Sequence, residues 1–200
     1  TEEAINHAMS VHDFETTAHL IERHILDLYF SSEIMLVYSW LKAFPEKVLN
    51  QYLLLAAVFT TASILVSSMS PESLEAANRR LQIAEIELEK KNAAIPNQTG
   101  INLTAAFVAT SRAYLARFKQ ENPALVIELT KKALDLLPED TLMFRSALLF
   151  NLASAYFLQD KPSQALSTFT QAQQIGLISG DHFNGIGAVF AQERLLTQLG

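Results

Sequence analysis

Four of the five histidines lie close together near the N-terminus: His7, His12, His19 and His24. Imidazole nitrogens bind zinc and related metals, and His19 lies three residues before Glu22, so one helix face could present both groups to a metal ion. Two ligands leave the metal's coordination shell incomplete, and Asp13, which separates His12 from His19, is typical of a residue that begins a new helix. We therefore interpret these histidines as half-exposed surface residues and expect no metal site.

The patterns that mark catalytic sites are missing from the sequence. It has no Gly-x-x-x-x-Gly-Lys loop, no Gly-x-Gly-x-x-Gly turn, no Gly-x-Ser-x-Gly nucleophile and no His-Glu-x-x-His metal pair. It has no cysteine, which excludes thiol nucleophiles, disulfides and cysteine-bound metals. Acidic pairs such as Glu139-Asp140 lie near predicted helix starts, where they complement the helix dipole. We predict that the chain is not an enzyme and that it binds no cofactor.

The charge balance argues against direct contact with nucleic acid. The net charge is -6, and the basic residues come as isolated doublets that acidic residues separate, rather than as a stripe. Half of the residues are hydrophobic, so the chain can bury a large core, and only six glycines and six prolines are present, fewer than an all-β fold would need. The composition predicts an all-α protein, and the lack of cysteine suits a cytoplasmic location.

One segment has no charged residue and is long enough to raise the possibility of a membrane span. It runs from Val48 to Pro71. Polar residues interrupt it throughout, and its strongly apolar part, Leu53 to Val66, is only as long as a core helix. We interpret it as a helix buried on most sides and expect no contact with a membrane.

Helix boundaries recur at short intervals along the chain. The start signals are Asp13, Ser32, Ser70-Pro71 and Asn122-Pro123, the breaks are Pro45, Pro138-Glu139-Asp140 and Asp160-Lys161-Pro162, and Gly176 and Gly180 are expected to flank the last connection. Further helices are predicted over Ala4 to Val11 and Gln51 to Ser67. Because no segment alternates with period two, we predict about nine or ten helices whose short connections make neighbours antiparallel.

An internal repeat indicates how these helices pack. Its bulky, small and aromatic positions follow the offsets of a tetratricopeptide-like unit: Leu149, Leu152, Ala153, Tyr156, Asp160, Ala165, Phe169 and Ala172. A degenerate copy lies 39 residues earlier, with Val126, Thr130 and Ala133 in place of Ala165, Phe169 and Ala172. One such unit cannot bury its own apolar face, so we predict an α-α superhelix of stacked antiparallel helix pairs.

Several segments resemble, in the same order, those of MalT-type proteins, the large ATP-dependent regulators of the LuxR class. They are Ala4-Ile5-Asn6-His7-Ala8-Met9, Asp13-Phe14, Ala18-His19-Leu20-Ile21-Glu22, Trp40-Leu41-Lys42-Ala43-Phe44-Pro45, Ala133-Leu134-Asp135-Leu136-Leu137-Pro138-Glu139-Asp140 and Asn151-Leu152-Ala153-Ser154-Ala155-Tyr156. Phe44 stands where leucine is usual, Ala153 where glycine is usual, and Glu121-Asn122 and Asp160-Lys161 replace the usual Gly-Asp turns. The resemblance implies the helical-repeat region of such a regulator, which senses an inducer and controls self-association, with the ATP-binding and DNA-binding modules outside this chain.

We accordingly expect residues 1–200 to form a single helical-repeat domain from a longer protein, with an alternative division into 1–92 and 100–200 around the loop 92–100. The expected partner is a small-molecule inducer or a regulatory protein, and the alternative function is a peptide-binding adaptor unrelated to transcription. On tetratricopeptide geometry, the following residues are expected to face a concave groove, with packing between repeats as the alternative: Ser111, Leu115, Lys119, Phe150, Ser154, Phe157 and Glu193.

Overall fold

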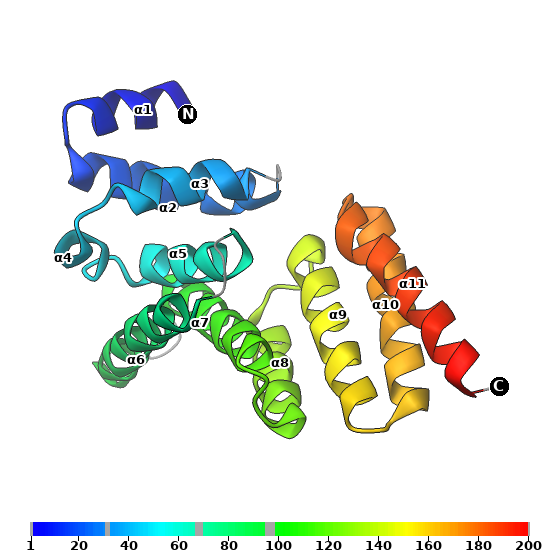
Figure 1. The fold of residues 1–200 in the computed structure, drawn as a ribbon. Coiled ribbons are helices and arrows are strands. Elements are labelled where there is room, and N and C mark those ends of the chain that lie inside the picture. Colours follow the sequence, from blue (N-terminus) through cyan, green and yellow to red (C-terminus); the bar gives the residue numbers. More distant parts are fainter. Residues whose placement is uncertain (1, 31–32, 67–69, 95–98, 200) are drawn as a thin grey trace. The chain divides into compact units, whose positions relative to one another are not determined.

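The computed structural model describes residues 2–30, 33–66, 70–94 and 99–199, and these residues form only helices and their connections (Figure 1). The described helices are α1 (Glu2–Ser10), α2 (Phe14–Phe30), α3 (Ile34–Lys42), α4 (Glu46–Leu49), α5 (Leu53–Val66), α6 (Pro71–Ala94), α7 (Thr99–Phe118), α8 (Pro123–Leu136), α9 (Leu142–Leu158), α10 (Pro162–Ser179) and α11 (His182–Leu199). The all-α prediction is confirmed. The count exceeds the expected nine or ten because Pro45 ends the α3 segment and also precedes a single helical turn, α4.

At three of the predicted helix starts, a side chain accepts a hydrogen bond from a backbone N–H, as an N-cap does. Asp13 Oδ1 accepts from the amide of Thr16 at 3.1 Å, and Ser70 Oγ accepts from the amide of Ser73 at 3.2 Å. Asn122 Oδ1 accepts from the amide of Ala124 at 2.9 Å, ahead of α8. The predicted cap Ser32 and residues 95–98 of the predicted loop 92–100 lie outside the described residues, whereas residues 92–94 and 99–100 belong to α6 and α7.

The chain divides into two compact units, Thr1–Ser111 and Arg112–Gly200. The boundary falls inside α7 and not in the loop 92–100 that the sequence suggested. The first part of α7 belongs to the N-terminal unit because it is hydrogen-bonded to α5: Ser111 Oγ lies 2.5 Å from Thr61 Oγ1 and 3.1 Å from the carbonyl oxygen of Ala57.

Helix α5 is the core of the N-terminal unit. It contacts α2, α3, α4 and α6, and ten of its fourteen residues are buried. The few polar side chains that it buries donate back along the helix, as Thr60 does to the carbonyl oxygen of Ala56 at 2.7 Å. The structure thus confirms that this uncharged segment is buried, and none of the helices in the described ranges is long and apolar enough to span a membrane.

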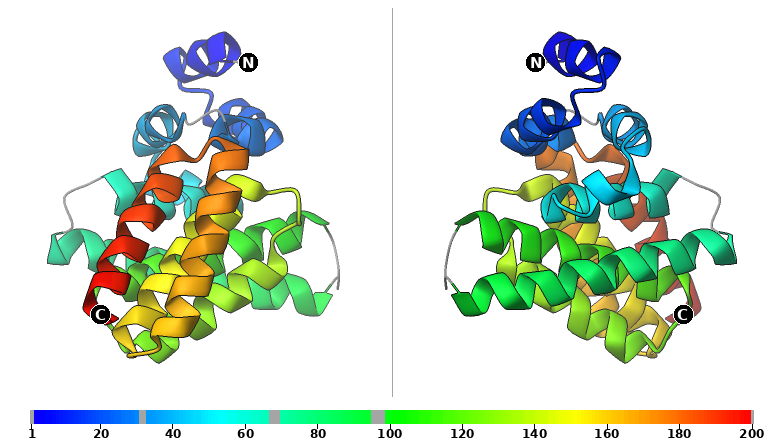
Figure 2. Two further views of the ribbon diagram at one scale, coloured as in Figure 1. Left: turned by 90° about the vertical axis from the view of Figure 1, so that its right-hand side faces the viewer. Right: turned by 90° about the vertical axis from the view of Figure 1, so that its left-hand side faces the viewer.

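In the C-terminal unit α9 contacts α8, α10 and α11, and both figures show α9, α10 and α11 side by side (Figures 1 and 2). The apolar repeat positions predicted to pack are all buried in one cluster: Leu149, Leu152, Ala153, Tyr156, Ala165, Phe169 and Ala172. Val126, Thr130 and Ala133 of the degenerate copy are buried as well. The bulky, small and aromatic pattern therefore identified the contacts that hold α8, α9 and α10 together.

A glycine pair sets the distance between α10 and α11. Gly176 was predicted to flank the last connection, and this was wrong, because it lies inside α10. A Cβ placed on Gly176 would come within 2.9 Å of the backbone of Gly185 in α11 and within 2.9 Å of Ser146 Oγ in α9. The connection itself is formed by Gly180, whose φ of 77° lies in the left-handed region that favours glycine.

Candidate ligand-binding groove

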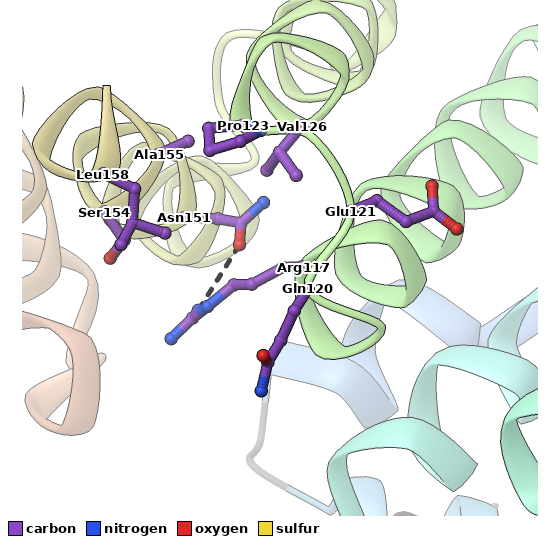
Figure 3. Close-up of a pocket in the computed structure, with 9 residues that line it drawn as sticks. All are labelled: Arg117, Gln120, Glu121, Pro123, Val126, Asn151, Ser154, Ala155 and Leu158. Atoms are coloured by element: carbon purple, nitrogen blue, oxygen red, sulfur yellow. Dashed lines mark hydrogen bonds between the residues drawn. The ribbon is translucent and has the colours of Figure 1, made fainter. Parts of the chain in front are cut away.

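Two hollows lie side by side in the C-terminal unit and share Arg117, Ser154 and Leu158 among their lining residues. The first has a volume of about 370 Å³ and is also lined by Gln120, Glu121, Pro123, Val126, Asn151 and Ala155 (Figure 3). The second has a volume of about 390 Å³ and is also lined by Phe150, Phe157, Phe169, Phe190, Ala191 and Arg194. We call the two hollows together the Arg117 groove. Each is in the size range of small-molecule sites.

The guanidinium of Arg117 is the charge at the centre of this groove. It comes from the end of α7 and is half-buried, and burial lowers the pKa of the group below its ordinary value. The residue keeps its positive charge because an arginine side chain is not deprotonated in a folded protein. Its Nη1 donates to Asn151 Oδ1 at 3.3 Å, and its guanidinium carbon lies 5.7 Å from the ring centres of both Phe118 and Phe150.

A buried amide holds Arg117 in place. Asn151 is fully buried in α9, and its Nδ2 donates to Thr130 Oγ1 of α8 at 3.0 Å. Thr130 in turn donates to the carbonyl oxygen of Val126 at 2.6 Å. The chain of bonds fixes the orientation of the amide, so that its oxygen faces the guanidinium, as Figure 3 shows. In the sequence, Asn151 is notable only as part of a family-like segment, and no motif around Arg117 indicates a functional residue.

The second hollow is largely aromatic. Phe150 and Phe157 come from α9, Phe169 from α10 and Phe190 from α11, and the rings of Phe150 and Phe169 pack edge to face at 5.5 Å. A second cation, Arg194, stands on the α11 side. The groove thus combines an apolar wall with two positive charges, an arrangement that suits a ligand with an apolar body and a polar head.

The structure brings together three of the residues predicted from sequence. Phe150, Ser154 and Phe157 line the Arg117 groove. Lys119 and Glu193 are exposed and are not among its lining residues; the ammonium of Lys119 lies 3.5 Å from the carboxylate of Glu121. The residues that face the groove from the α7 end are Arg117 and Gln120.

Ser111 and Leu115 require a correction. Both were expected to be exposed on the concave face, but their exposed fractions are 0% and 2%. Ser111 is covered by α5, to which its hydroxyl is hydrogen-bonded, and the apolar side chain of Leu115 is buried as well. For these two positions packing between helices, the alternative considered from the sequence, is the better description.

Three of the N-terminal histidines each have a different partner within the protein. The ring of His12 packs against Phe14, that of His19 against Tyr52, and His24 Nδ1 lies 3.7 Å from Asp27. No group of three or more potential metal ligands occurs in the part of the chain that the structure describes. Trp40 is buried, and its Nε1 donates to Asn6 Oδ1 at 2.8 Å, so its ring packs in the interior and offers no surface to a ligand.

No protein-family model matches the chain, and no curated protein and no solved structure matches it either.

Proposed function

We propose that this chain is the effector-sensing and oligomerisation region of a MalT-like transcriptional activator of the LuxR family, and that its effector binds in the Arg117 groove. The observation that carries the proposal is a half-buried cation at the junction of two hollows, one of which is walled by phenylalanines. A cation that is partly removed from water gains from a ligand that supplies a counter-charge or acceptors, and the aromatic wall gains from a ligand that displaces water.

The oligomerisation part of the proposal is supported by the exposed face of α11. Five large apolar side chains are exposed on this helix: Phe183, Ile186, Val189, Phe190 and Leu196. Their helical spacing places them on one side of α11, and a large exposed apolar patch marks an interaction site. Two such patches that face one another would form the core of an interface between two copies of the chain.

The groove and this face share Phe190, which lines the second hollow and is 66% exposed. A ligand that contacts Phe190 would therefore change the surface through which copies associate. If one arrangement of α9 and α11 binds the ligand better than another, ligand binding shifts the population toward the form that assembles. Signal relay in this proposal needs no catalytic residue, no cofactor and no nucleic-acid contact within the chain, which we place in the cytoplasm.

A screen of metabolites by thermal shift tests whether the groove binds an effector, since a ligand that binds only the folded state raises the melting temperature. Ser154 lines both hollows, so Ser154→Leu should fill them and abolish the shift that a hit produces. Ser39→Leu is the matched control, because Ser39 is an exposed serine in a helix of the N-terminal unit. A hit that shifts Ser154→Leu as much as wild type binds elsewhere and contradicts the proposal.

Sedimentation velocity tests the association face. We expect the wild type to sediment faster as its concentration rises, and Phe183→Ser, which changes a side chain that is 87% exposed, to weaken this dependence. Met35→Ser is the control, because Met35 is 59% exposed on α3 in the other unit. A wild type that stays monomeric at all concentrations with a saturating hit present contradicts the oligomerisation part.

The alternative is a peptide-binding adaptor, and one observation favours it: the two adjacent hollows offer a site longer than one compact ligand needs. The genomic sequence around the chain separates the two proposals. A phosphate-binding loop encoded upstream and a helix-turn-helix encoded downstream in the same reading frame would support the regulator. A reading frame that lacks both would favour the adaptor, as would a screen in which only peptides raise the melting temperature.

A further inference from the structure

Within the described residues, Arg117 is a partly desolvated cation with no acidic partner. Among these residues no carboxylate lies within 4 Å of its guanidinium, and the one hydrogen bond that its side chain makes to them goes to the neutral amide of Asn151. Glu121 lines the same hollow, but Figure 3 shows its carboxylate turned away from Arg117, and its ionic partner is Lys119. A guanidinium has five N–H donors, so most of the donor capacity of Arg117 is open to a ligand.

We infer that the ligand of the Arg117 groove is a small organic oxyanion, in which a carboxylate or phosphate binds Arg117 and a flat apolar body packs against Phe150, Phe157 and Phe190. The inference rests on the groove of the proposed function and adds the chemical class of its effector. It does not depend on self-association or on any role in transcription.

The guanidinium is held ready for such a ligand. The bond to the buried Asn151, which Thr130 fixes, leaves little freedom to reorient the plane, and the rings of Phe118 and Phe150 flank it at 5.7 Å. A planar, oriented guanidinium matches the two oxygens of a carboxylate or phosphate, because it can donate two parallel N–H bonds to them. Such charge-assisted bonds form without the entropic cost of ordering the side chain.

The contrast with Arg145 supports this interpretation. The Nη1 of Arg145 donates to the carbonyl oxygens of Leu134 and Leu137 at 3.0 Å and 3.4 Å, near the C-terminal end of α8. Those carbonyls are left unpaired by the helix end, so Arg145 has a structural task. Arg117 also lies in the last turn of a helix, α7, but among the described residues it has no comparable set of acceptors, and its guanidinium lines an open hollow.

The rest of the second hollow fits the remainder of the ligand. Its volume of about 390 Å³ is walled mainly by phenylalanine side chains, with Arg194 near the α11 side as a second positive charge. A flat apolar body gains from contact with aromatic rings, and the anionic head gains from both cations. An inorganic ion alone would leave the aromatic wall in contact with water, so we expect organic anions to bind more tightly than inorganic phosphate.

Calorimetric titration of the whole chain with matched probes tests the inference. Indole-3-acetate is compared with the neutral indole-3-acetamide, and phenyl phosphate with inorganic phosphate. We expect the acid to bind at least about 10-fold more tightly than its amide, the ratio that a charge-assisted hydrogen bond of about 1.5 kcal/mol gives. A preference for phenyl phosphate over indole-3-acetate would identify the head as phosphate, and the reverse would identify it as carboxylate.

Substitution of the cation supplies the second arm. Arg117→Met should weaken binding of the preferred anion by about 10-fold or more and leave the affinity for the amide unchanged. Arg117→Lys should retain part of the affinity. Lysine keeps the positive charge but lacks the two parallel N–H donors of the guanidinium. Arg79→Met, which removes an exposed arginine of α6, is the control and should change neither affinity. Circular dichroism melts of each variant confirm that it folds.

Three results would overturn the inference. One is that no anionic probe binds the wild type at millimolar concentration, and another is that the acid and its amide bind equally. The third is that Arg117→Met folds and binds the anion as the wild type does. Neutral metabolites could still raise the melting temperature of the wild type and not that of Ser154→Leu. In that case the groove binds an effector, as the proposed function requires, but the effector is not an anion. The wild-type comparison of acid and amide needs no variant, so it decides the question even where Arg117→Met fails to fold.

Discussion

The closest helix contact in the C-terminal unit gives the sharpest stability prediction. In Gly176→Ala the new Cβ would lie 2.9 Å from two backbone atoms of Gly185 and 2.9 Å from Ser146 Oγ. Ordinary carbon contacts lie at about 3.5–4.0 Å, so α10 and α11 must move apart by several tenths of an ångström. Overpacking of this kind costs about 3 kcal/mol at the upper end of its range. Alanine is more favourable than glycine within a helix by about 1 kcal/mol, which offsets part of this cost. We therefore expect the free energy of unfolding to fall by about 2 kcal/mol.

Gly185→Ala is a matched control, because it places the same methyl group on the facing helix. There the nearest atoms lie at 3.5 Å, an ordinary contact, so only the gain in helix propensity of about 1 kcal/mol or less should remain. The two variants should differ by about 3 kcal/mol although both change a buried helical glycine to alanine. The cause of the difference is the position of the neighbouring backbone, not the type of substitution.

Urea unfolding followed by circular dichroism at 222 nm measures this difference. With a slope of about 2 kcal/mol/M, a loss of about 2 kcal/mol lowers the midpoint by about 1 M. Fluorescence of Trp40, the only tryptophan, reports the N-terminal unit and serves as a reference in the same samples. If Gly176→Ala is as stable as the wild type, or if Gly185→Ala is the more destabilising change, the contact does not set the distance between α10 and α11.

Three further substitutions test other contacts. Asn151→Ala removes the acceptor of Arg117 and the donor to Thr130 from a buried site, and we expect the free energy of unfolding to fall by about 2–3 kcal/mol in urea titrations. An unchanged midpoint would show that water replaces the amide. Asn122→Ala removes the N-cap of α8 and should cost about 1 kcal/mol in the same assay, whereas Asn122→Ser, which restores a capping oxygen, should cost much less. Burial raises the pKa of Glu22, so its charge opposes folding at neutral pH and this cost disappears as the carboxylate is protonated in acid. Glu22→Gln should therefore raise the melting temperature at pH 7 and leave it unchanged near pH 4; a lower melting temperature at pH 7 would show that His19 and Lys91 stabilise the charged form more than burial opposes it.

Much of the fold could be predicted because its signals are local. The caps at Asp13, Ser70 and Asn122 need only nearby amides, and the structure shows each of those bonds. The repeat positions from Leu149 to Ala172 could be predicted because small and bulky side chains must alternate wherever helices approach closely. The turn α4 was missed because four residues after a proline are too few to show a helical period.

The site was harder to predict because exposure depends on contacts that are distant in sequence. Ser111 and Leu115 have the helical spacing of Phe150 and Ser154, but whether such positions face a groove depends on the neighbouring helices, and here they are covered. Arg117 gave no local signal, since its importance follows from the lack of a carboxylate within 4 Å among the described residues and from an amide 34 residues later in the chain. Gly176 lies near a connection, where glycine favours a turn, and only the packing of α11 shows that it is a helix-contact residue.

Hydrogen exchange of the whole chain, with and without the metabolite or organic anion that raises the melting temperature most, shows whether a ligand occupies the Arg117 groove. We expect slower exchange in peptides from α9 and α11, which carry Phe150, Phe157 and Phe190, and in the peptide that follows Arg117. The same ligand should leave these peptides unchanged in Ser154→Leu. Protection confined to residues 1–111, or equal protection in the wild type and Ser154→Leu, would contradict a ligand site in the Arg117 groove.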